Sequence, residues 1–197
     1  MAESTILKSR DRETFFRNWL GLLAFVNDKY NLVKKFGHPQ TPVGLKPESI
    51  DKLKTKLWEN VAIIDEYIDS VWDLPKDDIQ ILKGWKNKVE GSFTILKHLK
   101  KYSVFLDDKN DLLYGVIGIT SPISESIPAE ILPTMVKTVL LPFGDRIIYD
   151  SLFQVYNVQF GSNMRREYKE LYSEIKQKKG IKSTLDSMHY PRAADTG

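Results

Sequence analysis

The stretch Leu132–Gly161, LPTMVKTVLLPFGDRIIYDSLFQVYNVQFG, decides the fold of this chain. It is rich in β-branched and aromatic residues, which favour half-buried strands. Gly144-Asp145 interrupts the apolar run, and glycine at the first position of a two-residue loop favours a type II′ turn. The stretch therefore predicts a β-hairpin built from residues 135–143 and 146–151.

Working outward from this hairpin, four further segments are short apolar or alternating runs bounded by turn residues. Such runs are typical of strands. We expect strands at residues 93–96, 102–106, 112–119 and 154–160. The polar cluster at residues 107–111 predicts the turn between two of them.

Helical periodicity dominates the first ninety residues. Apolar side chains recur every three or four positions from Phe15 to Val33 and again from Ile50 to Val71, which places each set on one helix face. The first helix is expected to end before Pro39, because proline cannot continue the hydrogen-bond ladder. A third helix is expected to begin near Pro75. A last helix is expected to end at Gly180, which suits a C-cap.

This order of elements predicts an α+β protein. About three N-terminal helices are expected to pack with a four- to five-stranded antiparallel sheet and a closing C-terminal helix. We divide the chain into a helical part at residues 1–90, a sheet with the last helix at residues 91–182, and a tail at residues 183–197. The first two parts are expected to share one core.

Composition narrows the possible functions. The chain has 197 residues, 42% of them hydrophobic and 28% charged, with a formal net charge of +3 and no cysteine. The lack of cysteine excludes disulfides, thiolate zinc sites and cysteine nucleophiles. The charge is too small to indicate nucleic acid by itself. No signal peptide or run of ~20 apolar residues is present, so we expect a soluble cytoplasmic protein with no membrane partner.

The densest basic patch lies between two predicted strands. It contains Lys97, Lys100 and Lys101 beside Tyr102. Sheets that offer aromatic rings for stacking and lysines for phosphates bind single-stranded nucleic acid in many small modules. A solvated connector with Tyr102 in the core is the alternative.

A second set of cations, Arg165 and Arg166, begins the last helix, where free backbone N–H groups attract anions. Arg146 in the hairpin is a third candidate for ligand or nucleic-acid binding. The alternative is ordinary helix charges paired with Glu167 and Glu170. The chain contains no glycine-rich phosphate loop.

Evidence for catalysis is weak. His98, Asp145 and Asp150 are the candidate acid and base groups, but no nucleophile elbow accompanies them. Alternation along the hairpin places Arg146 and Asp150 on one face, where they are expected to pair. Neither the carboxylates near Asp65 nor the 107–111 turn has the ligand spacing of a metal site, so no metal and no cofactor is expected.

Three blocks resemble an uncharacterised bacterial protein family. They are SFTILKHLKKYSVFL at residues 92–106, LLYGVIGITSPI at residues 112–123, and the stretch 132–161. The resemblance rests on a "YGV" block, an "LLPF–turn–IIYD" block and an "FG" block before the last helix, and it spans roughly residues 91–185. Ser151 stands where the family pattern has glycine. Some members carry a C-terminal cysteine-rich zinc tail like that of SecA, which a chain without cysteine lacks. The resemblance implies no known activity.

These observations favour a non-enzymatic binding or interaction module that contacts nucleic acid or a protein through a basic and aromatic surface. A hydrolase or nuclease-like enzyme using His98, Asp145 and Asp150 is one alternative. The other alternative is an oligomerising structural protein. It would form a homo-oligomer if the helical seam, the apolar helix face of residues 50–71, stays partly exposed and packs against a second copy.

Overall fold

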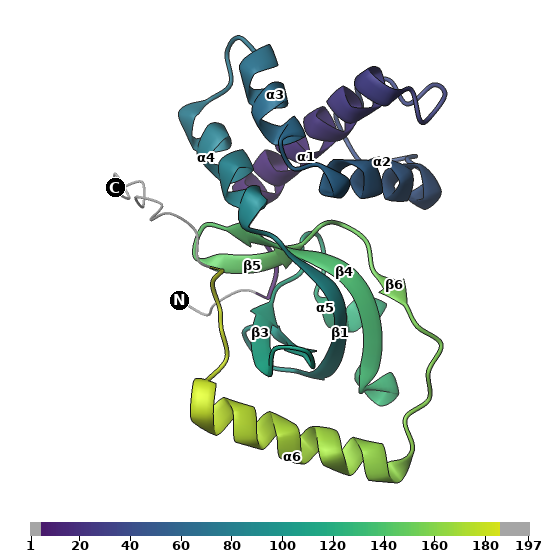
Figure 1. Ribbon diagram of the computed structural model, residues 1–197, viewed down its shortest axis with the longest axis vertical. Coiled ribbons are helices and arrows are strands. Elements are labelled where there is room, and N and C mark those ends of the chain that lie inside the picture. Colours follow the sequence, from purple (N-terminus) through teal and green to yellow (C-terminus); the bar gives the residue numbers. More distant parts are fainter. Residues whose placement is uncertain (1–4, 186–197) are drawn as a thin grey trace.

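The computed structural model describes residues 5–185, and it shows a barrel-like sheet with helices at opposite ends (Figure 1). Four helices, α1 to α4, lie at one end of the sheet, and the long helix α6 crosses the other end. Residues 186–197 of the expected tail lie outside the described range. The helices are α1 Ser9–Tyr30, α2 Pro47–Glu59, α3 Ile63–Ser70, α4 Lys76–Gly84, α5 Ile123–Ser126 and α6 Ser162–Lys179, with short 3-10 turns at Trp85–Asn87 and Ala129–Ile131.

The N-terminal helices differ from the predicted ones at two boundaries. Helix α1 ends at Tyr30, well before Pro39, because Asn31 takes a left-handed conformation with φ of 49° and its N–H bonds the Asn27 carbonyl. The single predicted helix through Val71 is wrong, because Asn60 leaves helical geometry and separates α2 from α3. Within residues 5–185, four helices therefore precede the sheet instead of about three.

The strands are β1 Val89–His98, β2 Ser103–Asp107, β3 Leu112–Val116, β4 Thr134–Phe143, β5 Arg146–Tyr149 and the short β6 Gln154–Val155. Strands β1 and β4 are the longest described strands of the sheet, with 10 residues each, and β1 pairs with two neighbours. Its first part pairs with β4 and its second part with β2. A register shift between Ile95 and Lys97 bends it, as β-bulges do. One strand can thus belong to both walls of the barrel.

The predicted hairpin is present, and its turn has the expected geometry. Phe143 pairs with Arg146 across the two-residue loop. Gly144 has φ of 61°, while Asp145 is not among the residues with positive φ. This combination is the one that a type II′ turn requires.

The sheet closes on itself, which corrects the expected open antiparallel sheet. The strand order is β1-β2-β3-β5-β4, and β4 returns to β1. Closure needs a parallel contact between β3 and β5, through the pair Val116 and Ile147. The Ile117 N–H extends this contact with a 2.9 Å hydrogen bond to the Ile147 carbonyl. A parallel pair links strands far apart in the sequence, so local patterns do not reveal it.

Two apolar clusters organise the interior. One fills the barrel, where Phe93, Phe105 and Ile147 pack with Ile123 of the short helix α5. The other joins helices α1 to α4 to the outer side of the barrel, and Val139, Leu141 and Ile148 belong to it. The seam expected to be left for a second copy is covered, since its members are buried or partly buried in this second cluster.

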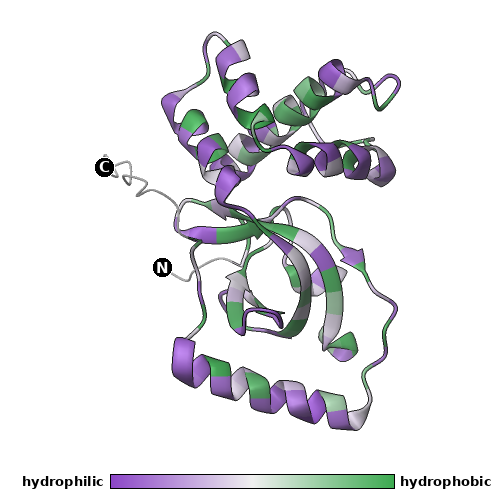
Figure 2. Cartoon of the chain, viewed as in Figure 1, coloured by the Kyte–Doolittle hydropathy of each residue, from purple (hydrophilic) through white to green (hydrophobic). Residues whose placement is uncertain are grey.

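Hydropathy follows the same division. Figure 2 shows hydrophobic colour concentrated on the strands and on the facing sides of the helices, while α6 is mainly hydrophilic along its outer side. Within residues 5–185, no helix has the length and apolar character needed to cross a membrane.

Candidate functional site on the C-terminal helix

Helix α6 packs on the outer side of strands β2 and β3. Val104, Leu106 and Leu113 point outward from these strands and form a cluster with Tyr172 and Ile175 of the helix. The intervening side chains point into the barrel, as strand alternation requires. The helix therefore covers this face of the barrel with its apolar stripe and turns its charged residues outward.

A groove runs between α6 and the end of β1. It has a volume of about 200 Å³. Strand β1 contributes Lys97, and α6 contributes Arg165, Tyr168 and Lys169. The remaining lining residues are Leu96, Pro133 and Tyr172. The groove thus brings together two of the predicted binding residues, Lys97 and Arg165, which are far apart in the sequence.

Lys97 and Tyr172 form the closest cation–aromatic contact in the described chain. The Lys97 ammonium lies 3.8 Å from the centre of the Tyr172 ring. Lys176 lies 5.7 Å from the same ring. These contacts place two positive charges near one aromatic ring, where each ammonium is attracted to the ring. Lys97 therefore helps to hold α6 in place as well as lining the groove.

The two adjacent arginines of α6 have different roles. Arg165 donates from Nε to the Phe160 carbonyl at 3.0 Å and from Nη1 to the Leu132 carbonyl at 2.6 Å. These bonds tie the first turn of α6 to the segment before β4. Arg166 is exposed and makes no side-chain bond within residues 5–185. Of the two, only Arg166 keeps its guanidinium available to a ligand.

Tyr102 has a packing role. Its ring lies over Gly115, where an added Cβ would approach within 2.8 Å of the ring. Tyr102 is half-buried and contacts both of the apolar clusters outside the barrel, the one under helices α1 to α4 and the one under α6. Lys100 and Lys101 are exposed in the turn that precedes it. Tyr102 thus packs against the protein, which was the alternative to a role in base stacking, while Lys100 and Lys101 remain on the surface.

Positive charge is concentrated around this groove. We define the basic face as residues 97–101 together with α6. It contains nine lysines and arginines and three glutamates, a net charge of +6, while the whole chain carries +3. The rest of the chain therefore carries −3. The mild overall charge conceals a strong separation between one end of the molecule and the remainder.

The candidate catalytic groups have separate partners. His98 is held between Ser103 Oγ at 2.7 Å and the Ile127 carbonyl at 2.8 Å. Because a carbonyl only accepts, Nε2 carries a proton and donates it to the Ile127 carbonyl, while Nδ1 and the Ser103 hydroxyl share the second hydrogen bond. Asp145 is exposed in the β4–β5 turn. Neither is bonded to Asp150.

Asp150 lies at the centre of a buried polar network. Its carboxylate is fully buried and accepts two 3.1 Å bonds from the Lys54 ammonium. Trp58 Nε1 donates at 2.9 Å and the Thr138 hydroxyl at 3.2 Å. Burial raises the pKa of the Asp150 carboxyl, and the charge of Lys54 opposes that rise. This network joins α2 to the barrel.

The expected pairing of Arg146 with Asp150 is wrong. The two residues do lie four positions apart on one strand face, but that spacing corresponds to roughly 13 Å along a strand. Arg146 instead lies 3.8 Å from the neighbouring Asp145 carboxylate and donates to the Ile6 carbonyl at 3.5 Å. Its side chain is half-buried and belongs to the N-terminal edge of the fold.

No group of three or more histidine, aspartate or glutamate side chains within residues 5–185 is arranged to hold a metal ion. In the 107–111 turn, Asp107 accepts from the Lys109 N–H at 3.1 Å and from the Asn110 amide at 2.7 Å. These bonds give the Asp107 carboxylate a role within the turn.

Sequence reasoning missed two aromatic residues of the groove, Tyr168 and Tyr172. Lys169 lies next to the predicted cations Arg165 and Arg166 in the sequence, and it lines the groove together with Arg165. A sequence signal exists, because Arg165, Lys169 and Tyr172 follow helical spacing along one side of α6. What the spacing does not reveal is that β1 lies opposite this side.

Comparison with family models, with curated proteins and with solved structures finds no match. The resemblance to an uncharacterised bacterial family therefore stays a prediction.

Proposed function

We propose that the protein is a non-enzymatic module that binds single-stranded nucleic acid across the basic face. The observation that carries this proposal is the concentration of a net charge of +6 on residues 97–101 and α6 in a chain of net charge +3. A cluster of positive charges on one surface is typical of proteins that bind the negatively charged phosphate backbone of nucleic acids.

Several cations of the basic face are free to exchange counterions for phosphates. Lys100, Arg166 and Lys169 are exposed, and within residues 5–185 none of them makes an ion pair or a side-chain hydrogen bond. Lys178, by contrast, pairs with Glu174 at 2.6 Å. Unpaired surface cations lose little when a phosphate replaces their hydration, so these three are the expected contacts.

The groove adds an aromatic component. Tyr168 is half-buried and lines the groove between Lys97 and Lys169. A tyrosine ring bordered by lysines suits a base next to its phosphates, because stacking on aromatic rings tolerates any base. This combination favours a single strand over a duplex, whose bases are already stacked.

The barrel supports the proposal by analogy. A closed five-stranded sheet in the order β1-β2-β3-β5-β4 has the connectivity of OB barrels, which commonly bind oligonucleotides. OB barrels use the β2–β3 face, whereas α6 covers that face here. The proposed surface is therefore the outer side of α6 with the adjoining β1–β2 turn.

The enzyme alternative has less support. His98 and Asp150 are each saturated by structural partners, and Asp145 lies apart from both. General acid and base groups must reach one substrate directly or through one water.

We also propose that the binding module acts in a bacterial cytoplasm. This part of the proposal rests on the family resemblance described above.

Matched charge reversals test this function. The variant Lys100→Glu with Lys169→Glu changes the basic face, and the control Lys76→Glu with Lys83→Glu makes the same change of charge on exposed residues of α4. Fluorescence anisotropy with a labelled oligothymidylate should show about a tenfold or larger loss of affinity for the first variant. The control should stay close to wild type.

Two outcomes would overturn the proposal. Equal losses in both variants would mean that binding follows overall charge and not this surface. No binding of the oligonucleotide by wild type at low salt would exclude nucleic acid, and capture of a protein by the basic face would then support the protein-binding form of the hypothesis.

A further inference from the structure

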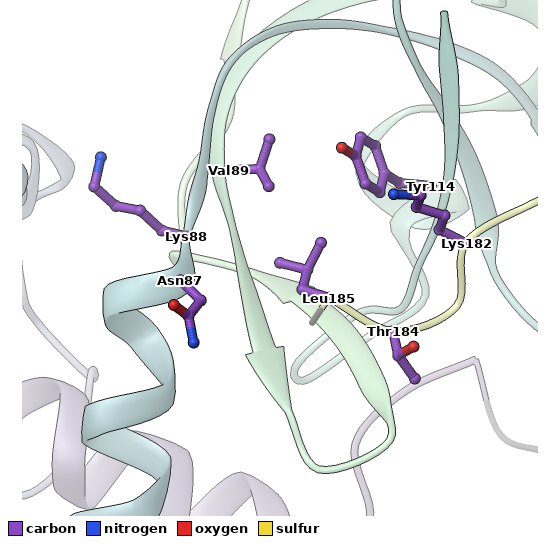
Figure 3. A pocket seen from close by; sticks show the side chains of 7 residues that line it. All are labelled: Asn87, Lys88, Val89, Tyr114, Lys182, Thr184 and Leu185. Atoms are coloured by element: carbon purple, nitrogen blue, oxygen red, sulfur yellow. The ribbon is translucent and has the colours of Figure 1, made fainter. Parts of the chain in front are cut away.

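A second cavity lies at the mouth of the barrel nearest the N-terminal helices (Figure 3). Its volume is about 290 Å³. It is lined by Asn87 at the end of the 3-10 turn, Val89 at the start of β1, Tyr114 of β3, and Lys182, Thr184 and Leu185 of the segment after α6. It shares no lining residue with the groove on α6.

Tyr114 is the unusual residue of this cavity. Its side chain is buried, with 4% relative exposure, and its ring meets Phe93 edge-on at 6.2 Å. Its hydroxyl has no hydrogen-bond partner within residues 5–185 and lines the cavity, where Figure 3 shows it directed toward Val89 and Leu185. The hydroxyl is not among the buried side-chain atoms that lack a partner, which are Asn18 Oδ1 and Trp85 Nε1 within residues 5–185, so it is open to the cavity as a donor that a ligand can engage.

Lys182 places a positive charge at the same mouth. Its backbone pairs with Tyr114, and residues paired across neighbouring strands project their side chains to the same face. Its ammonium has no ion pair or hydrogen bond in the described chain. Lys88 also lines the cavity, but its ammonium forms an ion pair with the Glu90 carboxylate at 2.5 Å and lies 5.5 Å from the centre of the Trp58 ring. Lys182 is therefore the available cation.

The other lining residues suit a small ligand that has both apolar and polar groups. Val89 and Leu185 supply apolar surface, and the Asn87 amide and Thr184 hydroxyl supply unoccupied hydrogen-bonding groups. Burial raises the pKa of the Tyr114 hydroxyl, which keeps it a protonated donor at neutral pH. The volume lies at the lower end of small-molecule sites, which limits the ligand to about one ring or a short chain.

We propose that the barrel mouth is a binding site for a small organic anion, in which Lys182 and the Tyr114 hydroxyl bind a carboxylate or phosphate and Val89 and Leu185 contact its apolar body. This site is independent of the nucleic-acid surface. An oxyanion satisfies the unpaired donor and the unpaired charge together, and donors to a charged acceptor make the stronger hydrogen bonds.

Ligand-observed NMR titration of the full chain tests the site with benzoate and phenyl phosphate as probes and benzyl alcohol as the uncharged counterpart. Both anions should bind saturably and more tightly than the alcohol, and the ratio of their affinities will separate a carboxylate site from a phosphate site. Tyr114→Phe and Lys182→Ala should each weaken binding of the preferred anion by about tenfold.

The Tyr114→Phe variant keeps the ring and removes only the unpartnered hydroxyl, so its thermal stability should not fall. Lys169→Ala on the basic face and Tyr30→Phe at the end of α1 are the controls, and both should bind the anion like wild type. The proposal is overturned if neither anion binds saturably. It is also overturned if Tyr114→Phe and Lys182→Ala bind as wild type does, or if Lys169→Ala weakens binding as much as they do.

Discussion

Asp150 shows how one residue can join two parts of the molecule. Lys54 and Trp58 reach it from α2, and Thr138 reaches it from β4. The sequence did not reveal this network, because Lys54 sits beside the apolar positions of an amphipathic helix and its partner is 96 residues away. Strand alternation did place Asp150 on the correct face, but it could not show that α2 covers that face.

Replacing Asp150 by asparagine should destabilise the fold strongly. The change leaves the Lys54 ammonium, whose side chain is 10% exposed, without a counter-charge in the interior. Breaking one side of a buried ion pair typically costs about 3–5 kcal/mol. Urea unfolding should show this loss, while Asp145→Asn in the exposed turn should change stability by less than about 0.5 kcal/mol.

A double variant separates the ion pair from simple packing damage. Lys54→Met with Asp150→Asn removes both charges, and we expect it to be more stable than Asp150→Asn alone. If the two losses simply add, the two side chains do not act as a pair and this interpretation of the network fails.

Tyr149 should make stability depend on alkaline pH. Burial, with the charge of Asp150 nearby, raises the pKa of Tyr149 to about 12. The unfolded chain releases this proton near pH ~10 and the folded chain only near the raised value, so stability is lost as pH rises through that interval. In Tyr149→Phe, guanidinium unfolding at increasing pH should show a loss smaller by about 2 kcal/mol at the upper end. Parallel curves for the two proteins would contradict this role.

At the scale of elements, local patterns predicted most strands and the ends that turn chemistry defines. The hairpin, the polar turn at residues 107–111 and the start of α6 lie where glycine and polar residues placed them. The break between α2 and α3 was missed, because apolar spacing continues through Asn60 and Val61. The spacing of apolar residues indicates which face of a helix is buried, but it does not indicate whether the backbone remains helical throughout.

The docking of α6 should depend on Arg165 and not on its neighbour. Arg165→Ala removes two bonds to backbone carbonyls, at Phe160 and Leu132, so the first turns of the helix should open more often. Amide hydrogen exchange in these turns should rise several-fold, with little change in the global unfolding temperature. Arg166→Ala is the matched control and should leave exchange unchanged, and equal effects of the two variants would remove Arg165 from this role.

At the scale of the whole molecule, two properties could not be predicted from the sequence. Barrel closure depends on the parallel contact of β3 with β5. These two strands are separated in the sequence by the β3–β4 connection and by β4 itself. The basic face depends on α6 returning to the end of β1. The separate groups of cations were visible in the sequence, but their union into one surface follows from the closed barrel and the helix that covers it.

The salt dependence of oligonucleotide binding tests the central claim most directly. If Lys100, Arg166 and Lys169 each contact one phosphate, the logarithm of the affinity should fall against the logarithm of the salt concentration with a slope of about −2. The Lys100→Glu and Lys169→Glu double variant should show a slope of about −0.7. A wild-type slope near zero, or a variant slope equal to that of wild type, would contradict binding of nucleic acid by the basic face.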